Sequence, residues 1–136
     1  MSIPAASMYP LRWRRWWLAA GFLLALGVTL LSLMPSPPVV SGHDKFSHLS
    51  AYGALALWFS GIYQPDRYGW LLLGLFALGV VIEILQGLGG HRQPEIADAA
   101  ANLIGIVIGL GLGRVALAGW CVRAERLIAG EGGGGD

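Results

Sequence analysis

Four long apolar stretches limit what this chain can fold into. They run over residues 16–34, 46–63, 70–88 and 96–118. Each is close to the roughly 20 residues that a helix needs to cross the hydrocarbon core of a bilayer. Lipid offers the backbone no hydrogen-bond partner, and no segment alternates polar and apolar residues as the strands of a barrel do. The sequence therefore predicts an all-α polytopic membrane protein, a four-transmembrane-helix bundle.

The rest of the composition agrees with short loops between these stretches. Only 12% of the residues are charged, whereas a typical soluble domain has about 25%. Breakers separate the apolar stretches: prolines at positions 35, 37 and 38, a turn over 64–68, and a Gly- and Pro-containing loop over 89–94. The chain is thus expected to form one membrane domain over residues 16–118.

Basic residues predict the orientation of this domain. Cytoplasmic loops of membrane proteins carry an excess of Lys and Arg. With four spans, one side receives seven arginines and the other receives only Lys45 and Arg92. Residues 1–15 are then a cytoplasmic basic and aromatic segment, and residues 119–136 a cytoplasmic tail with a disordered Gly-rich end. The seven arginines on the expected cytoplasmic side are Arg12, Arg14, Arg15, Arg67, Arg114, Arg123 and Arg126.

The net charge and the position of the basic residues also indicate which partners to expect. The formal net charge is only +1, and the one basic stretch with aromatic residues, 12–17, runs directly into the first apolar segment. Arginine and tryptophan at that position are typical of a membrane-interface anchor. We therefore expect the lipid bilayer, and no nucleic acid, as a partner.

Polar residues interrupt three of the apolar stretches near the predicted outer side. Within each stretch they are spaced three or four apart, so each helix carries one polar stripe. The economical packing turns the three stripes inward, where they form a polar cluster. This predicted cluster comprises Asp44, Lys45, His48 and Tyr52, then Glu83, Gln86 and Arg92, and finally Asp98 and Asn102.

Glu83 is the clearest case, because aliphatic residues surround it in the sequence. An ionisable group in the hydrocarbon region costs about 2.5–3.5 kcal/mol on insertion scales. Glu83 is therefore expected to have a cationic partner, for which Lys45, His48 and Arg92 are the candidates. Alternatively, it shares a proton with Asp98.

Glycines predict where the helices pack closely. Gly105, Gly109 and Gly113 recur at every fourth position, and Gly79 precedes Glu83 by four residues. Stripes of small residues let helix backbones approach each other. The same stripes also fit homodimerisation, so a homo-oligomer stays open.

Taken in order, these motifs resemble the VanZ-like family. The resemblance rests on Asp44-Lys45-x-x-His48, on Glu83-x-x-Gln86, on Arg92, and on Asp98-x-x-x-Asn102-x-x-Gly105, and it covers roughly residues 20–115. It implies a bacterial inner-membrane protein connected with the cell envelope, in a family named for low-level resistance to the glycopeptide teicoplanin. It implies no reaction. One departure is the Pro-Glu-Ile run at 94–96, where members often carry a small hydroxyl residue.

Three functions remain open for the predicted cluster. It binds an envelope lipid headgroup, a lipid-linked glycan or a lipophilic glycopeptide; or it is only an interhelical network; or it is a membrane-embedded acid–base hydrolase or transferase. The last lacks an obvious nucleophile, so we assign no catalytic residue. We assign no cofactor or metal either, because His43, His48, Glu83 and Asp98 have no HExxH-like spacing.

Overall fold

The computed structural model describes residues 7–35, 43–90 and 93–130, and the regular secondary structure over these ranges is helical. An isolated antiparallel bridge joins Met8 and Tyr63, and the described residues form no strand. The predicted all-α class is thus confirmed. The elements in chain order are α1 (Arg14–Ser32), α2 (Asp44–Ser60), the 3-10 turn η2 (Pro65–Arg67), α3 (Tyr68–Leu88), α4 (Ile96–Val115) and α5 (Trp120–Ile128).

Three segments are long and apolar enough to cross a membrane: Arg14–Ser32, Pro65–Leu88 and Ile96–Val115. They correspond to the first, third and fourth predicted spans. Their outward faces carry large aliphatic side chains, among them Leu23 on α1 and Val107 on α4. Such a surface suits lipid, because soluble monomers rarely expose large contiguous apolar patches.

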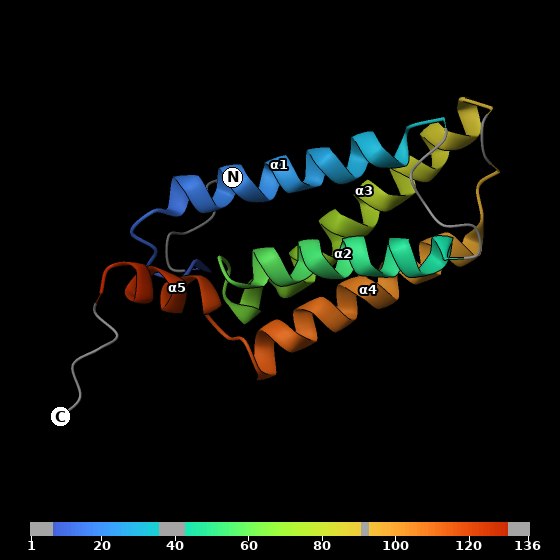
Figure 1. The fold of residues 1–136 in the computed structure, drawn as a ribbon. Helices are drawn as coiled ribbons and strands as arrows, with labels where there is room; N and C mark the ends of the chain where they lie inside the picture. The colour runs from blue at the N-terminus through green and yellow to red at the C-terminus, as the bar shows by residue number, and fades with distance from the viewer. Residues whose placement is uncertain (1–6, 36–42, 91–92, 131–136) are drawn as a thin grey trace.

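The long helices run alternately up and down. Figure 1 shows α1 and α3 running in one direction and α2 and α4 in the other. We call the end where α2 and α4 begin the polar end. The opposite end, where α1 begins and α5 lies, we call the clasp end.

Parallel packing of α2 against α4 forms the centre of the molecule and is the most extensive helix pairing. Glycines make it possible. A side chain at Gly105 would collide with the Leu49 carbonyl oxygen, and one at Gly109 with the carbonyl oxygen of Gly53. Gly113 in the same way faces Ser60. Because backbone cannot move aside as a side chain can, these contacts fix how closely the two helices approach.

Within the predicted tail, residues 120–128 form α5, and the Gly-rich end predicted to be disordered lies outside the described residues. The fourth long helix ends at Val115 rather than at residue 118, and Gly119 adopts a left-handed φ of 62° that turns the chain into α5. Cys121 and Glu125, four residues apart, are both buried. Contact with the start of α1 thus stabilises a helix too short to persist alone.

Candidate functional site

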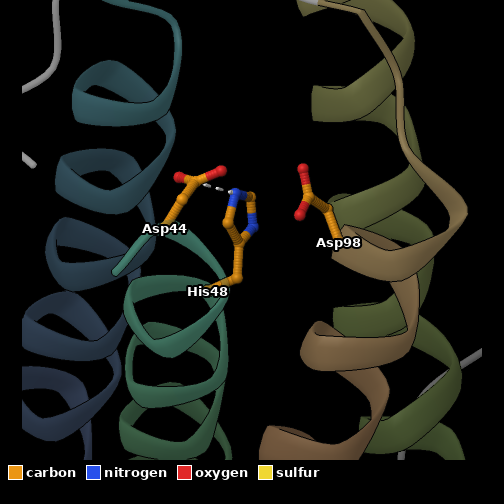
Figure 2. Close-up of side chains that lie close together, drawn as sticks. All are labelled: Asp44, His48 and Asp98. Atoms are coloured by element: carbon orange, nitrogen blue, oxygen red, sulfur yellow. Dashed lines mark ion pairs between the residues drawn. The ribbon is translucent and has the colours of Figure 1, made fainter. Parts of the chain in front are cut away.

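The polar end brings together side chains from α2, α3 and α4, and most of them are buried. Asp98 is fully buried, with 0% of its surface exposed, and Asn102 and Tyr52 are nearly so. Glu83 is 6% exposed and His48 is 9% exposed. The four-residue spacing explains the arrangement, because it puts Asp44, His48 and Tyr52 on the α2 face that meets α4. Figure 2 shows Asp44 and His48 facing Asp98 across this interface.

His48 lies at the centre of the group. Its Nδ1 is 3.0 Å from Asn102 Oδ1, and since an amide oxygen can only accept, Nδ1 carries the proton. Its Nε2 is 3.8 Å from Asp44 Oδ1. Glu83 Oε1 is 4.0 Å from Nδ1. One imidazole ring therefore connects residues of three helices.

Lys45 is one of the candidate cationic partners predicted for Glu83, but the two side chains do not pair. Its ammonium group instead lies 2.9 Å from Glu95 Oε2 and 3.4 Å from Asp98 Oδ1. Glu95 was not among the predicted cluster residues. Its position immediately before α4 is a signal that sequence can offer, because carboxylates are favoured at helix N-termini.

Glu83 keeps neither of its carboxylate oxygens hydrogen-bonded within the described residues, and both are buried. The backbone N–H of Glu95 approaches the carboxylate without meeting hydrogen-bond geometry. The Tyr52 hydroxyl is likewise buried without a hydrogen bond. Gly79 makes room here, since a side chain at that position would come within 2.8 Å of Asn102 Nδ2 and 3.3 Å of the Tyr52 hydroxyl. A buried polar group without a partner costs about 1–3 kcal/mol.

Gln86 lies apart from the hydrogen bonds around His48. Its amide Nε2 donates to the backbone carbonyl of Ser32 at 2.6 Å, which ties α3 to the end of α1. Its Oε1 is buried without a hydrogen bond in the described part of the chain. Arg92, the remaining member of the predicted cluster, lies outside the described residues.

The clasp end contains a carboxylate whose partners sequence reasoning missed. Glu125 accepts hydrogen bonds from the backbone N–H groups of Arg12 and Trp13 at 2.7 and 2.8 Å, and from the Trp17 indole at 2.8 Å. It thereby ties α5 to the residues that lead into α1. Burial raises the pKa of the Glu125 carboxyl, but the hydrogen bonds from Trp13, Arg12 and Trp17 outweigh this and hold the pKa below its usual range.

Aromatic rings complete the clasp end. Trp17, Trp58 and Trp120 come from α1, α2 and α5, and each pair of ring centroids lies 5.3–5.5 Å apart. Their largely tilted or edge-on arrangement is favourable for aromatic pairs. The Trp58 indole donates to the Trp17 carbonyl and the Trp120 indole to the Leu57 carbonyl.

The polar end offers acid and base groups without an activated nucleophile among the described residues. The Ser47 hydroxyl donates to the His43 carbonyl at 3.1 Å. Cys121 lies at the clasp end, where burial, and then the charge of Glu125, raise the pKa of its thiol to about 12. One ligand atom from each of Asp44, His48 and Asp98 lies within 4.8 Å of the other two, a spacing at which a metal ion could be held.

Comparisons of this chain with protein-family profiles, with curated proteins and with solved structures gave no match.

Proposed function

We propose that this chain is a four-span protein of a bacterial inner membrane, resembling the VanZ-like family, whose polar end binds the headgroup of an envelope molecule. The expected ligand class is an envelope lipid, a lipid-linked glycan or a lipophilic glycopeptide. Both termini are cytoplasmic in this proposal, and the site lies in the outer leaflet.

The contact between the chain's two ends supports a fourth span. Glu125 after α4 accepts hydrogen bonds from Arg12 and Trp13 before α1, so both regions lie on one side of a membrane. Three crossings would put them on opposite sides, whereas a crossing by α2 restores an even number. The 17 residues of α2 rise about 25 Å at 1.5 Å per residue, close to the roughly 30 Å of the hydrocarbon core.

The distribution of arginine supports the orientation. The described arginines lie before or at the start of α1, between α2 and α3, and from the end of α4 onward. All of these positions are at the clasp end of the molecule, and Lys45 is the described basic residue at the polar end. The positive-inside rule therefore favours a cytoplasmic clasp end.

One observation carries the binding proposal: among the described residues, four of the five buried polar side-chain atoms without a hydrogen bond lie at the polar end. They are the Tyr52 hydroxyl, both Glu83 carboxylate oxygens and the Gln86 amide oxygen, and the fifth is Arg67 Nε at the clasp end. A network that served only to hold helices together would be satisfied internally, because nearly all buried polar groups in native proteins are. Carboxylate and amide oxygens accept hydrogen bonds, so the headgroup should present hydroxyl or amine donors.

This interpretation differs from a site built around an anion. Lys45 is already engaged by Glu95 and Asp98. Among the described residues, acceptor groups therefore predominate around His48, which favours the hydroxyl-rich face of a glycan or an amine-bearing headgroup over a bare phosphate.

Native mass spectrometry of detergent-purified protein, incubated with a bacterial total lipid extract, tests the proposal. Wild type should retain a lipid-sized adduct that Glu83→Gln loses, while Asp66→Asn at the clasp end retains it. An adduct kept equally by all three proteins, or kept by none, would support the purely structural network instead.

A further inference from the structure

Beyond headgroup binding, we propose that Asp44, His48 and Asp98 bind a divalent transition-metal ion of the Zn²⁺ or Mn²⁺ class. The three side chains come from two helices that pack tightly together. Their ligand atoms all lie within 4.8 Å of one another, and Figure 2 shows the His48 ring between the carboxylates of Asp44 and Asp98.

The spacing is close to what coordination requires. Zn²⁺ binds imidazole nitrogen and carboxylate oxygen at about 2.0–2.2 Å, so ligand atoms on one ion lie roughly 3–4.4 Å apart. The 3.8 Å between His48 Nε2 and Asp44 Oδ1 falls in that range. Their four-residue spacing on α2 corresponds to the separation of the two histidines of helical zinc motifs.

His48 is oriented as a metal ligand is. Because Nδ1 donates to Asn102 Oδ1, Nε2 is the ring nitrogen on the Asp44 side, 3.8 Å from Asp44 Oδ1. Metal-ligating histidines almost always donate their other ring nitrogen to an oxygen acceptor, which fixes the tautomer. A cation between Nε2 and the Asp44 carboxylate would be bound by both.

Glu83 supplies an independent indication of a cation. It is 6% exposed, makes no hydrogen bond in the described residues, and directs Oε1 at the Nδ1 side of the same ring. A carboxylate on the far side of a ligating histidine increases its affinity for a metal.

The donor set selects the metal class. One imidazole nitrogen with two carboxylate oxygens suits borderline ions such as Zn²⁺ and Mn²⁺. Ca²⁺ prefers six to eight oxygen ligands, and Mg²⁺ favours oxygen and retains several waters. Three protein ligands leave at least one coordination position open, and Asp44, whose side chain is one-third exposed, gives access from outside.

Metal titration of the delipidated protein tests this inference. Chelator-treated protein in detergent is titrated with ZnCl₂ against a chromophoric competitor, and then with CoCl₂ to record the visible bands of a nitrogen- and oxygen-ligated ion. Wild type should bind one equivalent. Asp44→Asn and His48→Gln should weaken binding about tenfold or more, whereas His43→Gln, at an exposed position just before α2, should bind as wild type does.

Circular dichroism and gel filtration establish that each variant is folded. If His48→Gln does not fold, the test rests on Asp44→Asn, because Asp44 is partly exposed. Absence of Zn²⁺ binding by wild type overturns the proposal, as does equal binding by the folded Asp44→Asn variant. Loss of binding in His43→Gln would assign the ion to an adventitious surface site and also overturn it. Because no lipid is present, failure of the headgroup proposal leaves this outcome unchanged.

Discussion

Two glutamates at opposite ends of the molecule are almost equally buried but differ in their hydrogen bonds. Glu125 is 7% exposed and Glu83 is 6% exposed. Glu125 accepts three hydrogen bonds of 2.7–2.8 Å from the start of α1. Glu83 accepts none in the described residues, and its Oε1 lies 4.0 Å from His48 Nδ1.

The difference separates a structural carboxylate from one available for a ligand. A buried carboxylate is tolerated when hydrogen bonds replace its lost hydration. Glu125 meets that condition within the fold, so its role is complete without any other molecule. Glu83 meets it only if something else supplies donors or positive charge, and that need is what both proposals for the polar end address.

The largest effect is expected from Glu125→Ala. It leaves two backbone N–H groups and the Trp17 indole without their acceptor, which should lower the free energy of unfolding by about 2–3 kcal/mol. Thermal and denaturant unfolding in detergent measure this. Arg126→Ala, an exposed change on the same helix, should stay within about 0.5 kcal/mol of wild type. If the two variants are equally stable, the hydrogen bonds of Glu125 do not stabilise the fold, and Glu125 is not a structural carboxylate.

A smaller loss is expected from Gly79→Ala at the polar end. The added methyl would come within 2.8 Å of Asn102 Nδ2 and 3.3 Å of the Tyr52 hydroxyl. Overpacking of this kind costs about 1–2 kcal/mol when a side chain can shift. Gly74→Ala is the matched control on α3, since nothing lies within 4 Å of its added methyl. If both variants unfold alike, Glu83 lies in loose rather than well-packed surroundings.

Glu83→Gln should leave the ligand-free protein as stable as wild type or more stable by about 1 kcal/mol. It removes a buried carboxylate that makes no hydrogen bond within the described residues, and neutral replacements of such groups are often tolerated or stabilising. The same unfolding measurements apply. If Glu83→Gln lowers the free energy of unfolding as much as Glu125→Ala does, Glu83 is part of an interhelical network. The two glutamates would then not differ in role.

Sequence reasoning succeeded where spacing alone determines the outcome. Asp44, His48 and Tyr52 share one face of α2 because they are four residues apart, whatever the helix packs against. The glycines of α4 likewise pointed to close packing without identifying α2 as the neighbour. The apolar stretches predicted three segments that the structure also finds suited to crossing a membrane.

Pairings that depend on how helices rotate and slide were beyond sequence alone. Lys45 reaches Glu95 and Asp98 rather than Glu83, and Gln86 bonds the end of α1 instead of joining the His48 group. The α5 helix was missed because nine residues give little periodic signal and derive their stability from tertiary contact. The partners of Glu125 are more than 100 positions away, so no local pattern in the sequence points to them.

The smallest effect is a pH dependence confined to the clasp end. Hydrogen bonds hold the pKa of Glu125 in the folded protein below its usual value, about 4.3 in unfolded chains. A depressed folded pKa stabilises the protein at neutral pH, and that contribution is lost as pH falls below about 5 and through the folded pKa. The stability difference between wild type and Glu125→Gln should therefore be greatest near neutral pH and shrink on acidification. Unfolding of both proteins from pH 7 to pH 3 measures it, with Asp66→Asn as an exposed carboxyl control, and a difference that grows on acidification would contradict the assigned role of the carboxylate.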